Sequence, residues 1–129
     1  MISWGWFDIE DDEIFGPQAP FLHSVRSCAE SWEWCEPGDT YVLVDDEQPA
    51  DRLRLVVDVT SLTSGSVSST LGVFFRGNLI ECGELHAQDF SSLLAGSRLK
   101  GLKVSGTPEA LGRAAAVWLA QTASVIRSR

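Results

Sequence analysis

The chain has 129 residues, of which 44% are hydrophobic, and its formal net charge is −8. This length and composition fit one domain whose core is large enough to fold without disulfides. No apolar run approaches the roughly 18 residues that a membrane-spanning helix needs, and we expect no secretory signal. The acidic balance disfavours binding to nucleic acid, because phosphates would be repelled. We therefore expect a cytoplasmic protein that binds neither nucleic acid nor membrane.

The charge is unevenly distributed along the chain. Residues 1–50 hold twelve Asp or Glu and a single Arg, whereas residues 51–129 carry a net charge of +3. An acidic half of this kind favours a basic protein partner by steering its approach. The competing interpretation is that these carboxylates only keep the protein soluble.

Residues 1–20 combine tryptophans with acidic side chains and are a candidate extended arm. Trp4 and Trp6 precede a dense acidic run formed by Asp8, Glu10, Asp11, Asp12 and Glu13. Tryptophan is enriched at binding hot spots, so the arm would grip a basic surface with Trp4 or Trp6 as its anchor. Alternatively, the tryptophans fill the core or cover a sheet edge while the carboxylates face water.

Two stretches have the apolar spacing of helices that bury one face. Residues 21–35 form the first, with an apolar stripe at Leu22, Val25, Cys28, Ala29, Trp32 and Cys35. Residues 107–127 form the second, because Thr107 is a good N-cap and Pro108 suits the first helical position. A third, short helix is expected over residues 87–94, before Gly96.

The central feature is a β-hairpin over residues 67–84. Gly77 and Asn78 suit a two-residue turn, which places Phe75 opposite Ile80 and makes one face of the hairpin apolar. Strands at 40–46 and 53–60 would form another hairpin, whose connection carries further acids at Asp45, Asp46 and Glu47. Residues 99–104 would form the last strand.

These elements predict a single α+β domain over residues 1–129. Its mainly antiparallel sheet has four to five strands, with the 21–35 and 107–127 helices packed on one face. Val56, Phe74 and Tyr41 would lie on the opposite, partly solvated face. Exposed aromatic side chains there would mark an interface.

The sequence does not contain a recognisable catalytic or metal-binding pattern. His23, Cys28, Cys35, Cys82 and His86 lack the spacing of a zinc site, and the acidic run lacks the glycine and glutamate of an EF-hand. A nucleophilic set of Cys82, His86 and Asp89 is disfavoured because Cys82 would face the core. Glycine-rich phosphate loops are absent. We expect no catalytic residue, metal or cofactor.

The leading hypothesis is a non-catalytic, acidic protein-binding module, for example an inhibitor or immunity-type protein that masks a basic partner. One alternative is a ligand-binding domain or small enzyme with a pocket between sheet and helices, lined by Trp32, Trp118 and His23. Another is a homodimeric structural subunit or secretion-chaperone-like protein. The likeness to immunity proteins and chaperones is one of size, charge and element order.

Overall fold

The predicted hairpin lies at the centre of the sheet. It consists of β3 (Val67–Phe75) and β4 (Leu79–His86). The Arg76 amide donates to the Leu79 carbonyl at 2.9 Å, and Gly77 adopts a φ of 89° that favours glycine. The pairs Phe75–Ile80, Val73–Cys82 and Leu71–Glu84 all form as expected, so the hairpin register is confirmed.

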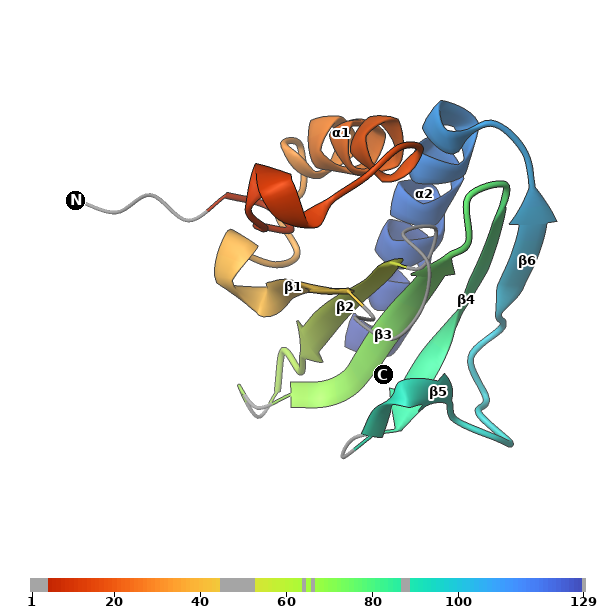
Figure 1. The fold of residues 1–129 in the computed structure, drawn as a ribbon. Helices are drawn as coiled ribbons and strands as arrows, with labels where there is room; N and C mark the ends of the chain where they lie inside the picture. The colour runs from red at the N-terminus through yellow and green to blue at the C-terminus, as the bar shows by residue number, and fades with distance from the viewer. Residues whose placement is uncertain (1–4, 45–52, 64, 66, 87–88, 129) are drawn as a thin grey trace.

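The computed structural model describes residues 5–44, 53–63, 65, 67–86 and 89–128. Within these residues the antiparallel strands β1 (Thr40–Val44), β2 (Leu53–Thr60), β3 and β4 lie side by side in chain order. The last strand, β6 (Leu102–Ser105), pairs with the first half of β4, while β5 (Asp89–Leu93) pairs with its end. Figure 1 shows α1 and α2 on one side of this sheet. The predicted α+β fold is confirmed.

The expected short helix over residues 87–94 is wrong, because residues 89–93 form a strand instead. The apolar spacing of so short a stretch fits either element. Its pairing with β4 places the Leu93 side chain over Gly83, where a Cβ would come within 3.1 Å of Leu93. The last strand begins at Leu102 rather than at 99.

The first helix, α1 (Gln18–Ala29), has different limits from the predicted 21–35. It starts earlier because Pro20 falls in its first turn, where a missing N–H costs little. It ends earlier because Trp32 leaves the helix, and its indole packs against Trp34 with ring centroids 4.7 Å apart. The apolar spacing of residues 32–35 therefore reflects an aromatic cluster outside the helix.

The second helix, α2 (Pro108–Arg127), begins where the sequence predicts. The Thr107 hydroxyl accepts from the Ala110 amide at 3.3 Å, and Pro108 occupies the first helical position. The helices touch at Gly112, where a Cβ would lie only 2.6 Å from the Phe21 carbonyl oxygen. Together they cover the apolar face of the hairpin, and Phe21 stacks on Phe75 at 4.1 Å.

The opposite face of the sheet is more covered than expected. Val56 and Phe74 lie on it, but both are buried together with Leu85. Leu85 fills the space above Gly72, where a Cβ would meet its side chain at 2.6 Å. Tyr41 also lies on this face, and 45% of its surface is accessible.

Candidate functional site

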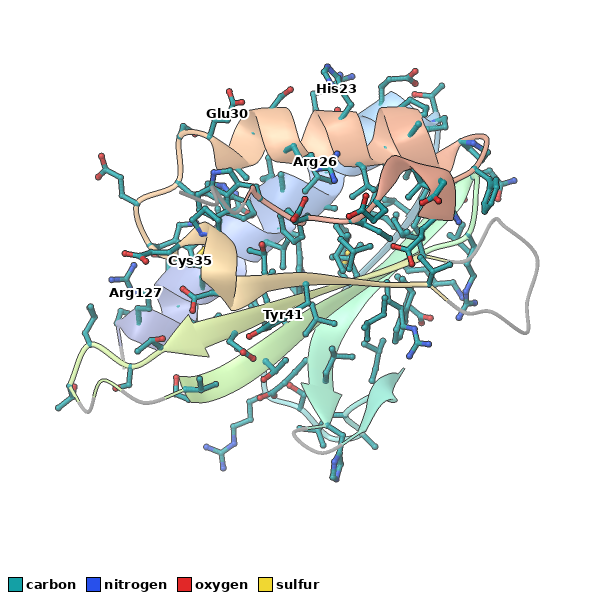
Figure 2. All side chains as sticks on the ribbon, turned by 60° about the vertical axis from the view of Figure 1, so that its left-hand side comes forward. His23, Arg26, Glu30, Cys35, Tyr41 and Arg127 are labelled. Atoms are coloured by element: carbon teal, nitrogen blue, oxygen red, sulfur yellow. The ribbon has the colours of Figure 1, made fainter. Side chains whose placement is uncertain are left out.

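The segment before α1 is fastened to the body of the protein at Phe7. This residue is fully buried and adopts a φ of 47°, which is strained for a bulky side chain. Its amide donates to the Thr40 hydroxyl at 2.9 Å, and its carbonyl accepts from the Arg26 guanidinium at 2.8 Å. Arg26 also donates to the Trp6 carbonyl at 3.1 Å. Figure 2 shows Arg26 on the lower side of α1, whereas His23 and Glu30 point away.

The candidate anchor Trp6 belongs to the aromatic cluster beside this attachment point. Its indole meets Trp32 edge to face, with ring centroids 5.6 Å apart. The Phe7 ring also meets Trp32 edge to face, with ring centroids 6.0 Å apart. Trp6 is half-buried, so part of its surface remains free for a partner. Trp4, the other candidate anchor, lies outside the described residues.

The acidic side chains that follow are placed beside the first strand. Asp8, Glu10, Asp12 and Glu13 are all exposed, and residues 11–13 form one turn of 3-10 helix. A groove of about 330 Å³ lies between this segment and β1. Its lining consists of Asp8, Ile9, Glu10, Glu13, Val42, Leu43 and Val44. We call this feature the acidic groove.

Not every predicted acidic residue can be placed in the acidic groove. Asp12 is exposed but does not line it. The Asp11 side chain lies outside the description, as do Asp45, Asp46 and Glu47. Asp8, Glu10 and Glu13 are therefore the part of the predicted set that the structure brings together.

The acidic groove borders a sheet edge. Among the residues that the structure describes, β1 pairs with β2 alone. The Thr40 amide bonds to the Pro37 carbonyl rather than to β2, and outward and inward amides alternate along an antiparallel strand. The N–H and C=O groups of Val42 and Val44 therefore point to the free edge, whereas those of Tyr41 and Leu43 pair with β2.

The uneven charge of the sequence becomes a spatial separation of charge. The acidic segment and β1 lie on the left of Figure 1, and β6 lies on the right. Exposed cations gather on and near β6 and on α2: Arg98, Lys100, Lys103 and Arg113. A molecule of this polarity orients a charged partner during its approach.

Cys82 and His86, two members of the disfavoured nucleophilic set, are not brought together by the fold. Cys82 is buried on the helix-covered face, whereas His86 is exposed at the far end of β4. Four residue steps along the strand place their Cα atoms about 13 Å apart, so the two side chains are beyond hydrogen-bond reach. Burial, and secondarily the Glu81 charge, raises the pKa of Cys82 to about 12. Cys82 therefore stays a neutral thiol at neutral pH.

Cys35 resembles Cys82 in its protonation. Burial raises its pKa to about 12, with Asp39 and Glu36 adding to the shift and Arg127 opposing it. Figure 2 shows Cys35 and Arg127 near the same end of the molecule. Within the described residues, no cluster of three or more His, Cys, Asp or Glu side chains could hold a metal ion.

The three residues proposed to line a pocket are not brought together. Trp32 lies in the aromatic cluster, and His23 is exposed on α1. Trp118 is buried on α2, and its indole N–H donates to the Lys100 carbonyl at 2.9 Å. Trp118 lines a different, mostly apolar cleft of about 460 Å³ between α2 and the segment that leads into β6.

Comparisons with known proteins do not assign a family. Neither protein families, nor curated proteins, nor solved structures match this chain. No described helix has both the length and the apolar character needed to cross a bilayer.

Sequence reasoning identified the carboxylates but missed the strand edge and the Arg26 attachment. The apolar stretch from Thr40 to Val44, followed by acidic residues, indicates a strand but not its position at the edge. Arg26 reaches backbone carbonyls 19 and 20 positions away, and no local pattern marks such contacts.

Proposed function

We propose that this protein is a non-catalytic cytoplasmic module that binds and masks a basic protein partner, as an immunity-type inhibitor does. The observation that carries the proposal is the acidic groove, in which Asp8, Glu10 and Glu13 lie beside the edge of β1 that pairs with no other strand in the described residues. Exposed carboxylates accelerate the approach of a basic surface and select it over acidic ones.

A capture experiment with matched charge variants tests this proposal. The wild-type protein and the double variants Glu10→Lys/Glu13→Lys and Glu30→Lys/Glu33→Lys are used as baits in lysate of the source cells. Both variants change the net charge equally, and all four positions are exposed. We expect a basic protein that is retained by the wild type and by the second variant, and lost with the first and at raised salt. Capture of the same proteins by all three baits, or of none, contradicts the proposal.

A second candidate function is ligand binding in the cleft beside Trp118. Its volume falls in the range of small-molecule sites, and the cationic residues Arg98 and Lys100 line it, which favours an amphiphilic anion. Thermal denaturation with a panel of fatty acids tests this candidate. An increased Tm would support it, and an unchanged Tm throughout the panel would count against it.

A third candidate function is that of a homodimeric structural subunit. A homodimer would use the exposed aromatic side chain of Tyr41 on the less covered sheet face. The molar mass in solution distinguishes a dimer from the other two functions.

A further inference from the structure

The edge strand beside the acidic groove has two properties that together specify a ligand. Its Val42 and Val44 backbone groups point outward, and no strand pairs with them in the described part of the chain. Such an edge is a template for another strand. The stretch Thr40–Val44 also contains no proline and no charged residue, and these are two of the means by which proteins block an edge.

The side chains around this edge differ between its two faces. Val42 and Val44 pack toward the helix-covered core, against which Ile9 and Ile14 also pack. The segment that carries Asp8, Glu10 and Glu13 therefore lies on this side of β1. Leu43 packs toward the other face, where Tyr41 is exposed. A strand added to this edge would alternate its side chains between the same two faces.

We infer that the partner contributes an extended segment which pairs with β1 as an added strand and presents Lys or Arg at every second position to the acidic groove. This inference rests on the proposed function and deepens it, because it names the binding mode and the sequence pattern of the bound segment. The alternate side chains lie beside Tyr41 and Leu43, where β-branched residues fit.

The charge of the groove also decides against the obvious competitor for the edge. A second copy of this chain would bring its own β1 and with it a second set of exposed carboxylates. Like charges placed opposite each other destabilise strand pairing. The same residues that attract a basic segment therefore oppose edge-to-edge self-association.

Backbone pairing is tested with a capped peptide of sequence Lys-Thr-Lys-Val-Lys-Thr-Lys and two N-methylated forms of it. One form carries methyl groups on the backbone nitrogens of its lysines, and the other on the backbone nitrogens of its threonines and valine. Only one of these two sets of amides faces β1, because amides alternate along a strand. Binding to the full-length protein is measured by titration calorimetry at low salt.

We expect one methylated form to lose at least about tenfold in affinity while the other changes by less than about twofold. A loss of affinity when the lysine amides are methylated indicates an antiparallel added strand, because the backbone groups of the lysines would then exchange hydrogen bonds with those of Val42 and Val44. Loss with the other form indicates a parallel one. Equal effects of the two forms, or no binding of the parent peptide, overturn the inference.

The charge variants separate this inference from the proposed function. Glu10→Lys/Glu13→Lys should weaken parent-peptide binding at least about tenfold, and the control Glu30→Lys/Glu33→Lys less than about twofold. If both methylated peptides bind equally but charge reversal in the groove still abolishes binding, strand pairing is overturned while the proposed function stands. If the two charge variants behave alike, the acidic groove is not the site, and both proposals fail.

Discussion

At the scale of single residues, the acidic segment depends on a few hydrogen bonds formed by side chains far away in the sequence. Phe7 is held in a left-handed conformation by Thr40 and Arg26. Strained backbone of this kind persists only where the surrounding contacts over-determine it. The position of Asp8 and Glu10 over β1 is therefore a consequence of contacts at residue 7.

Removing the Arg26 guanidinium should destabilise the protein. We expect Arg26→Ala to lower the free energy of unfolding by about 1–3 kcal/mol, because hydrogen bonds from a charged donor to two carbonyls are lost. Urea denaturation measures the change. The control is Arg113→Ala, which removes an exposed arginine for which no partner is found in the described residues. Its free energy of unfolding should stay within about 0.5 kcal/mol of the wild-type value. Equal stabilities of the two variants would contradict the attachment.

The buried thiol of Cys82 should make stability depend on alkaline pH. Burial, with a smaller contribution from Glu81, raises its pKa from 9.0 to about 12 in the folded state. The folded state therefore holds the thiol proton more tightly than the unfolded state does. The resulting contribution to the free energy of unfolding is complete below about pH 9 and declines as the pH rises toward 12.

Urea unfolding between pH 8 and pH 10 tests this dependence. The stability of the wild-type protein should fall over this range, and Cys82→Ala should be less stable at pH 8 but show a shallower decline. An unchanged slope in the variant would show that Cys82 does not titrate as described.

At the scale of elements, the regular parts of the fold could be predicted because their signals are local. The turn at Gly77 set the register of β3 and β4, and Thr107 with Pro108 marked the start of α2. The end of α1 could not be predicted, because Trp32 matches helical spacing yet packs in an aromatic cluster. The candidate site was predicted in its carboxylates but not in its strand edge, since strand order depends on long-range pairing.

The contact between α1 and α2 requires glycine at position 112. A Cβ there would lie 2.5 Å from the Ser24 Cβ and 2.6 Å from the Phe21 carbonyl oxygen. Glycine to alanine ordinarily stabilises a helix by about 1 kcal/mol, but here we expect Gly112→Ala to destabilise the protein by about 1–3 kcal/mol. Thermal denaturation measures it, with the exposed Ser124→Ala of the same helix as control. A stabilised Gly112→Ala protein would show that the helices separate freely.

At the scale of the whole molecule, the acidic and basic ends give the protein an orientation toward other charged molecules. The acidic end coincides with the edge of β1 that no strand of the described residues covers, and the basic end with the segment around β6. Steering by exposed charge is screened by salt, whereas backbone pairing is much less affected.

Salt should therefore change the rate of association more than the rate of dissociation. For the alternating lysine peptide, raising the ionic strength from about 0.01 M to about 0.15 M shortens the screening length from roughly 30 Å to 8 Å. We expect the association rate to fall several-fold and the dissociation rate to change little, as measured by stopped-flow tryptophan fluorescence. The opposite pattern, a larger change in the dissociation rate than in the association rate, would contradict steering of the approach by the exposed carboxylates.

The most direct test of the account is amide hydrogen exchange in β1 with and without the alternating lysine peptide. We expect the Val42 and Val44 amides, which point away from β2, to become protected when the peptide binds. The Tyr41 and Leu43 amides already pair with β2 and should change little. Protection that spares Val42 and Val44, or that appears instead around α1 or β6, would contradict the assignment of this edge as the binding site.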